Sequence, residues 1–130
     1  MSATIYTDIR AALTAHLASM ADLPEVAWEN VGFTPTTGTP YLKPEILWSE
    51  SFQSEIGTDG ANRESGIYQI TCNYPPGEGS GPLNAMLGKI RDRFKRGTTL
   101  TYNGLTVKIR KVYPGPGGII SIAFYCTAPN

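Results

Sequence analysis

The sequence contains few of the residues that an enzyme or a metal site requires. Of its 130 residues, one is histidine and two are cysteine. Cys72 and Cys126 are too far apart to form a metal-binding pair such as C-x-x-C, and there is no G-x-S-x-G motif. His16 lies beside a helical apolar stripe without an orienting partner or a nucleophile, so we interpret it as a structural residue. We therefore expect no catalytic, cofactor-binding or metal-binding residues and no cofactor.

The sequence also lacks a long apolar run. The longest, around residues 119–125, is far shorter than the roughly 20 residues that a membrane-spanning helix needs. The N-terminal stretch MSATIYTDIR has no basic region followed by an apolar one, as a secretion signal would. We therefore expect a soluble protein without membrane contact, folded as one domain over residues 1–130. In a reducing cytoplasm, both cysteines should be buried free thiols.

Charge is balanced overall but unevenly distributed along the chain. Residues 1–78 carry three basic and ten acidic side chains, whereas residues 79–130 carry eight basic and one acidic. Such a split favours head-to-tail self-association, or one face turned toward a polyanion. The candidate interface residues are charged side chains from both parts, namely Glu50, Glu55, Asp59, Arg63, Arg91, Arg93, Lys95, Arg96, Lys108 and Arg110.

Apolar periodicity predicts an α+β fold, with a mostly antiparallel sheet flanked by an N-terminal helix and a second helix. We expect the helices over residues 4–20 and 82–94, the second ending at Gly97. Strands are expected over residues 26–33, 41–48, 67–74, 100–102, 105–113 and 119–128, and Asn103-Gly104 should form a tight hairpin turn. Pro44 lacks a backbone donor, so its strand should lie at an edge or contain a bulge.

Two polar segments interrupt this pattern. Residues 49–66 show little periodicity, so we interpret them as a long loop or loosely formed hairpin arm that contacts a partner. Residues 74–82, YPPGEGSGP, are rich in glycine but lack the lysine of a phosphate-binding loop, and Glu78 adds a negative charge. We interpret this second segment as a turn from a strand into a helix.

The chain resembles the phage tail terminator, or tail completion, proteins of long-tailed phages and prophages. The resemblance rests on IRAALTAHLASM (9–20), LPEVAWENVGFTPTTGTPYLKPEIL (23–47), GANRESGIYQITCNYPPGEGSGP (60–82) and LNAMLGKIRDRF (83–94). It covers roughly the whole chain. It implies a small α+β subunit that forms a ring, commonly a hexamer, on the head-proximal end of the tail tube. Such a ring would stop tube polymerisation and present a surface for head-tail joining, without catalysis.

The resemblance also implies partners and a location. The partners are other copies of the chain, the tail tube protein and head-completion or connector proteins, in a virion tail or neck assembled in the host cytoplasm. The basic candidate interface residues could form ion pairs with acidic residues of the next subunit. They could instead line a lumen through which DNA passes as cargo, or form a solvated helix face. Two other interpretations stay open: a head-tail connector or adaptor protein, and a nucleic-acid-binding module whose binding would depend on salt.

Overall fold

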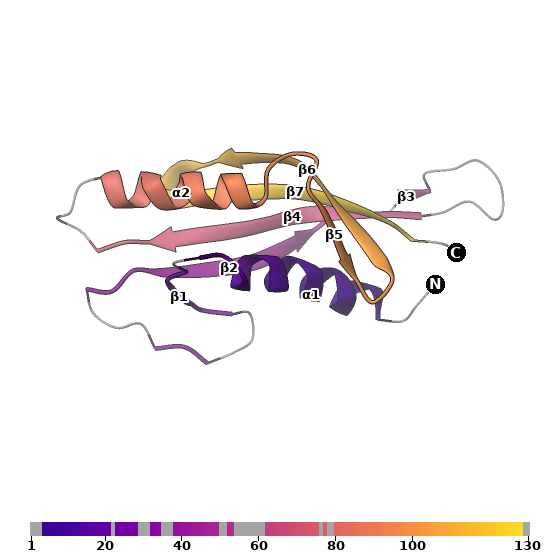
Figure 1. The fold of residues 1–130 in the computed structure, drawn as a ribbon, viewed down its shortest axis with the longest axis horizontal. Helices are drawn as coiled ribbons and strands as arrows, with labels where there is room; N and C mark the ends of the chain where they lie inside the picture. The colour runs from indigo at the N-terminus through magenta and orange to yellow at the C-terminus, as the bar shows by residue number, and fades with distance from the viewer. Residues whose placement is uncertain are drawn as a thin grey trace.

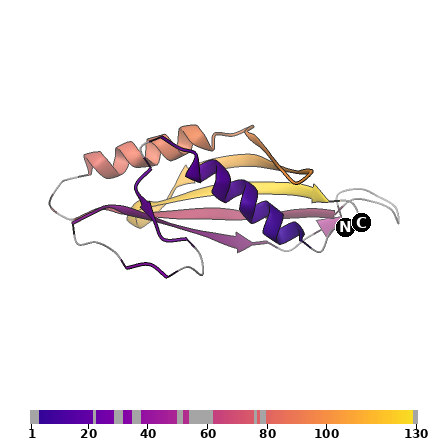
Figure 2. The same ribbon diagram turned by 60° about the horizontal axis from the view of Figure 1, so that its bottom comes forward.

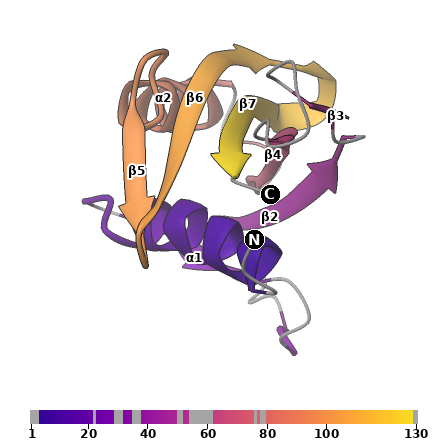
Figure 3. The ribbon, with the colours of Figure 1, turned by 90° about the vertical axis from the view of Figure 1, so that its right-hand side faces the viewer.

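A curled sheet carries both helices on the same face (Figures 1 and 3). The computed structural model describes residues 4–21, 23–28, 32–34, 38–49, 52–53, 62–75, 77 and 80–128, with the backbone alone at 52–53, 62–63 and 127–128. In these residues seven strands form the sheet, in the order β1-β2-β4-β7-β6-β5, with β3 paired to one end of β4. The α+β fold predicted from the sequence is confirmed.

The sheet is antiparallel except at one edge. Its strands are β1 (Glu25–Val26), β2 (Tyr41–Trp48), β3 (Phe52–Gln53), β4 (Asn62–Asn73), β5 (Thr99–Tyr102), β6 (Leu105–Pro114) and β7 (Ile119–Ala128). Only β1 and β2 run parallel. The turn from β5 to β6 has the positive φ angles expected of a tight hairpin, 52° at Asn103 and 81° at Gly104. A bulge interrupts the pairing of β6 with β7 between Ile109 and Lys111.

The two helices bury one stripe each. Helix α1 (Ile5–Ala18) crosses the strands obliquely (Figure 2) and turns Ile5, Ile9, Leu13 and Leu17 inward. Helix α2 (Gly81–Arg93) contributes Met86 and Ile90, and Phe94 follows directly at its end. A short 3-10 turn, Pro116–Gly118, precedes β7. Neither α1 nor α2, the helices of the described residues, has the length and apolar composition needed to cross a membrane.

One apolar core lies between the helices and the sheet. The inward residues of β4, β6 and β7 alternate as the sequence predicts, and the largest fully buried side chains are Tyr68, Phe94 and Phe124. Tyr68 packs against Phe94, with ring centroids 6.1 Å apart, and so joins the middle of the sheet to the end of α2. Each large apolar side chain buried in this way contributes about 1.5–3 kcal/mol, so this core is the main source of stability.

Two strands differ in extent from the sequence-based prediction. The first expected strand, residues 26–33, is replaced by the two-residue β1, Glu25–Val26, which shares only Val26 with it, and residues 29–31 lie outside the described residues. In contrast, β4 starts at Asn62, inside the predicted arm, and β3 pairs with it. Glu64 and Gly66 occupy inward positions of β4, so the apolar alternation that marks a strand is missing there. Residues 50–51 and 54–61 of the arm lie outside the described residues.

The two cysteines are buried and free, as expected. Cys72 pairs with Leu42 and Cys126 with Glu64, so they lie near opposite ends of β4. At a rise of about 3.3 Å per residue this separation is roughly 26 Å, far beyond the reach of a disulfide. Burial raises the pKa of Cys72 to about 12 and, together with the Glu64 charge, that of Cys126 to about 11. Both remain unreactive thiols at neutral pH.

Gly66 tests the packing of β4 against its neighbours. A Cβ at this position would lie 2.7 Å from the Leu47 backbone oxygen and 3.0 Å from Phe124 Cζ. We therefore expect Gly66→Ala to lower the free energy of unfolding by about 1–3 kcal/mol. Gly88→Ala is the matched control, because nothing lies within 4 Å of its added Cβ; in a helix it should stabilise by about 0.5–1 kcal/mol. Denaturant unfolding measures both, and equal effects would contradict this packing.

Candidate interaction surface

Most of the predicted basic residues gather around the end of α2. Arg91 is exposed on α2, Lys95 and Arg96 are exposed in the following turn, and Lys108 and Arg110 are exposed on β6. Backbone hydrogen bonds from Gly97 N to Ile109 O, 3.0 Å, and from Ile109 N to Thr98 O, 2.9 Å, hold that turn against β6. We call these five residues the basic surface. The predicted Arg63 lies in β4, opposite Phe52 and Thr127, and its side chain is outside the described residues.

Arg93 differs from these five because it is used within the chain. Its side chain is half-buried, its Nε donates a hydrogen bond to His16 O at 3.1 Å, and its guanidinium also donates to Ser19 Oγ. Both acceptors belong to the C-terminal end of α1, where backbone carbonyls lack helical donors and a positive charge is favourable. Arg93 therefore joins the two helices, a role that the sequence did not indicate.

His16 is the other half of this helix-helix contact. Its Nε2 donates to Arg93 O at 2.7 Å, and its ring packs edge-on against Phe94 at 4.9 Å. Burial lowers the pKa of His16 below its usual 6.5, the hydrogen bond to Arg93 O opposes this effect, and the Arg93 charge adds to it. The neutral ring is thus the favoured form in the folded protein. Both observations agree with the structural role expected for His16.

Two acids that are not buried lie at the opposite end of the sheet. Glu25 is exposed on β1 and Glu45 is half-buried on β2 beside the exposed Lys43, whereas β5 and β6 form the other end of the strand order. Asp92, also exposed, lies on α2. The predicted acidic interface residues Glu50, Glu55 and Asp59 lie outside the described residues.

A group of aromatic residues anchors the base of the predicted arm. Glu64, buried on the inner face of β4, accepts a hydrogen bond from the Tyr6 hydroxyl at 3.0 Å. The ring of Tyr6 packs edge-on against Trp48 at 4.8 Å, and Trp48 packs against Phe124 at 5.9 Å. The hydrogen bond and charge of Glu64 raise the pKa of Tyr6, so its hydroxyl stays protonated and donates. These contacts tie the start of α1 to Trp48 of β2, where the arm begins, and to Glu64 of β4, near where it ends.

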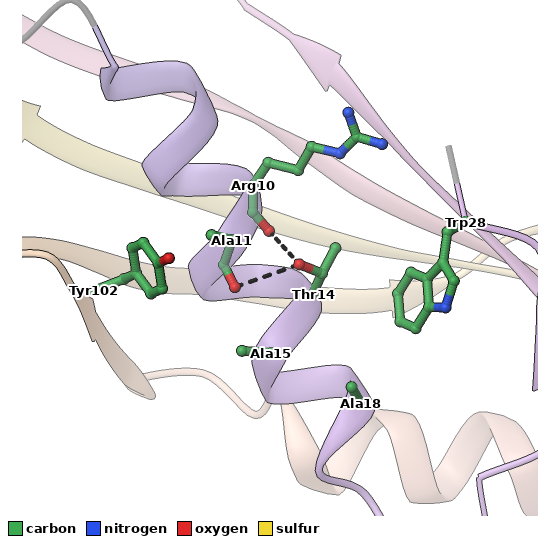
Figure 4. Close-up of a pocket in the computed structure, with 7 residues that line it drawn as sticks. All are labelled: Arg10, Ala11, Thr14, Ala15, Ala18, Trp28 and Tyr102. Atoms are coloured by element: carbon green, nitrogen blue, oxygen red, sulfur yellow. Dashed lines mark hydrogen bonds between the residues drawn. The ribbon is translucent and has the colours of Figure 1, made fainter. Parts of the chain in front are cut away.

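A shallow hollow lies on the outward face of α1 (Figure 4). It has a volume of about 450 Å³ and is lined by Arg10, Ala11, Thr14, Ala15, Ala18, Trp28 and Tyr102. Trp28 and Tyr102 flank the helix on either side. The Thr14 hydroxyl donates to Arg10 O at 2.8 Å, so its proton is used within the helix. The lining is mostly methyl groups and rings, without a nucleophile and base in contact.

The described residues hold no cluster of three or more His, Cys, Asp or Glu side chains that could bind a metal ion. The described residues instead present a group of exposed cations, exposed aromatic rings and, at residues 44–48 of β2, a strand edge without a described neighbour. These are features of a protein that acts through contacts.

Comparison with known proteins indicates the family. The model of a family described as phage tail terminator protein matches residues 8–128. A solved structure superposes with a TM-score of 0.62 at 21% sequence identity, covering 95% of this chain and 94% of that one; at this identity it shows the fold alone. No protein with a curated description matches the chain.

Arg93 and Arg91 provide a matched pair of substitutions. We expect Arg93→Ala to lower the free energy of unfolding by about 1 kcal/mol, because His16 O and Ser19 Oγ lose a charged donor. Arg91→Ala should change it little, since Arg91 is exposed. Thermal unfolding of both variants measures the difference. Equal stability of the two variants would show that the Arg93 contact contributes nothing.

The lowered pKa of His16 predicts a pH dependence of stability. As the pH falls below 6.5, the unfolded chain takes up a proton on His16 before the folded protein does. Stability from this residue is therefore present above pH 6.5 and is lost as the pH falls toward the folded pKa. We expect His16→Gln to be less stable than the wild type at neutral pH and to lose less of its melting temperature on acidification. A parallel loss in both proteins would argue against this assignment.

Proposed function

The chain belongs to the phage tail terminator family and is a structural component of the phage tail, and we propose that it caps the head-proximal end of the tail tube as a ring. In this role it ends tube polymerisation and presents a surface to the head-completion or connector proteins. Its partners are other copies of the chain, commonly six per ring, and the tail tube protein. The protein performs no catalysis in this role.

The ring proposal is supported by the positions of the basic surface at one end of the sheet and of acidic residues at the other. A closed ring requires a heterologous contact, in which one patch of a subunit meets a different patch of its neighbour. The basic surface lies at the α2, β5 and β6 end, and Glu25 and Glu45 lie at the β1 and β2 end. Complementary charges at opposite ends favour head-to-tail association of identical subunits. In the alternative arrangement, the same basic residues line a passage for DNA.

Charge reversal on the basic surface tests the contact. The triple variant Arg91→Glu, Lys95→Glu and Arg96→Glu should reduce ring formation, because like charges would then face each other across the contact. Arg93 is left unchanged, since it joins the two helices. Lys43→Glu is the comparison, because this exposed residue lies on β2 beside Glu45, where a reversal adds negative charge to the acidic end and should leave the ring intact.

Native mass, measured by light scattering across concentration and salt, gives the result. The wild type should form a species near six times the 14.1 kDa subunit mass, weakened by high salt. The triple variant should shift toward the subunit mass, and Lys43→Glu should shift less. A ring that persists in the triple variant would exclude the charge contact. If the triple variant forms normal rings through which DNA no longer passes, the result would instead favour basic residues that line a DNA passage.

A further inference from the structure

A groove lies beside β5, the strand at the other end of the sheet from β1. It has a volume of about 330 Å³ and borders the hollow on α1, because Ala15 and Tyr102 line both. One wall is formed by β5, and the other by small or polar residues of α1, namely Ala12, Ala15, His16 and Ser19. In the described residues no strand pairs with this side of β5. The groove therefore combines an open strand edge with a helix wall of mostly small side chains.

The pairing of β5 with β6 determines which backbone groups face the groove. The two-residue turn Asn103-Gly104 makes Tyr102 part of the first hydrogen-bonded pair of the hairpin, so its N–H and C=O point to β6. Because these directions alternate along a strand, Leu100 also faces β6, whereas Thr99 and Thr101 turn both groups outward. The edge thus offers two donors and two acceptors to an incoming extended segment.

The surroundings of the groove favour an acidic segment with an apolar side chain. Lys95 and Arg96 are exposed in the turn directly before β5, and Lys108, also exposed, pairs with Thr99. No acidic residue occurs in β5 or β6. Beside Tyr102 the lining is mostly apolar. Strand addition combines backbone hydrogen bonds with pockets for individual side chains, and opposite charge adds specificity.

The chain contains a segment of this composition. Residues 49–61, SESFQSEIGTDGA, include three acidic residues and neither Lys nor Arg. In residues 54–61, which lie outside the described residues, Ile56 is the one large apolar residue. The residues that flank this stretch, Gln53 and Asn62, pair with each other on the same side of β4 as β2. In the proposed ring, the β1 and β2 end is the one that meets the basic surface of the next subunit.

A copy cannot place this segment in its own groove. Eight residues that are held at both ends reach at most about 13 Å away from β3. A strand added to β5 would lie four strand spacings from β4, about 19 Å along the sheet. Figure 3 shows β3 and β5 on opposite sides of the molecule. The occupant of the groove is therefore the segment of a neighbouring copy.

We propose that residues 54–61 of one copy add a short strand to β5 of the next copy, in the groove between β5 and α1. The added strand pairs with the outward groups of Thr99 and Thr101, Ile56 packs beside Tyr102, and the acidic residues lie near the basic surface. One segment and one groove per copy make a head-to-tail contact, which can close into a ring. The inference rests on the proposed ring and names the segment that links its subunits.

Peptide binding to a subunit that lacks its own segment tests the contact directly. In this arm-shortened chain Asn-Gly replaces residues 54–61, because Gln53 and Asn62 face each other and a two-residue turn closes such a hairpin. The probe is a fluorescent peptide of residues 49–62, SESFQSEIGTDGAN, and fluorescence anisotropy measures its binding. A peptide of the same composition in scrambled order controls for charge alone. We expect saturable binding of the native peptide, weakened by salt, and weaker binding of the scrambled one.

Two substitutions at one position of the arm-shortened chain report on the strand edge. Thr101→Pro removes an outward N–H and leaves the pairing of β5 with β6 intact. It should weaken peptide binding about ten-fold or more, since one donor is lost and the proline ring obstructs the edge. Thr101→Val keeps the N–H and should bind as the parent does. The proposal is overturned if the native peptide does not bind, or if the scrambled peptide or the Thr101→Pro variant binds equally well.

The native mass of the unlabelled proteins separates this contact from the ring itself. Rings of the wild type that are lost in the arm-shortened chain would support the segment contact. Rings that form equally well from the arm-shortened chain would overturn the segment contact and leave the ring proposal intact. A wild type that stays monomeric while the peptide binds the groove would count against the ring and support the groove as a strand-binding site.

Discussion

The structure depends on the burial of both helices against one face of the curled sheet. Tyr68, Phe94 and Phe124 fill the centre of this core, and α1 adds a stripe with a spacing of four residues. Because the helices occupy the inner face, the outer face of the sheet and the edge at β2 are left for contacts. The same packing brings the end of α2 beside the end of α1, where Arg93 and His16 connect them.

This arrangement divides the cations of the second half into two groups. Arg93 completes the C-terminal end of α1, whereas Arg91, Lys95, Arg96, Lys108 and Arg110 are exposed. A cation that joins two helices and an exposed cation two positions away on one helix look alike in the sequence. Burial and hydrogen bonding distinguish the two kinds of cation, so the basic surface contains only the exposed ones. The same difference also separates substitutions that change a helix-helix contact from substitutions that change only the charge of the surface.

Much of the fold could be predicted from the sequence, because most elements bury one regular stripe. Both helices, the Asn103-Gly104 hairpin and the alternation of β7 are confirmed, and beside Pro44 no described strand pairs with the outer side of β2. The first part of β4 could not be predicted, because Glu64 and Gly66 replace apolar residues at its inward positions. The buried Glu64 is compatible with the core because Tyr6 donates to it, a contact between residues 58 positions apart that no local pattern indicates.

The candidate site was predicted less completely, for a related reason. Charge patterning indicated the basic residues but not the Arg93 contact, which depends on how α1 and α2 pack. Pro44 indicated an edge strand, while the exposure of Leu47 and Trp48 there follows from the absence of a described neighbour beyond β1. Alternation at Trp48 alone would place it in the core, and only the three-dimensional structure shows that it is 43% exposed at the margin.

The most direct measurement of the proposed function is the length of phage tails, by electron microscopy, in lysates with and without this protein. If the protein caps the tube, its loss should produce tails that are longer than normal and variable in length, and expression of the wild-type chain should restore a uniform length. Tails of normal length that fail to join heads would contradict the capping role and identify the protein as a connector instead.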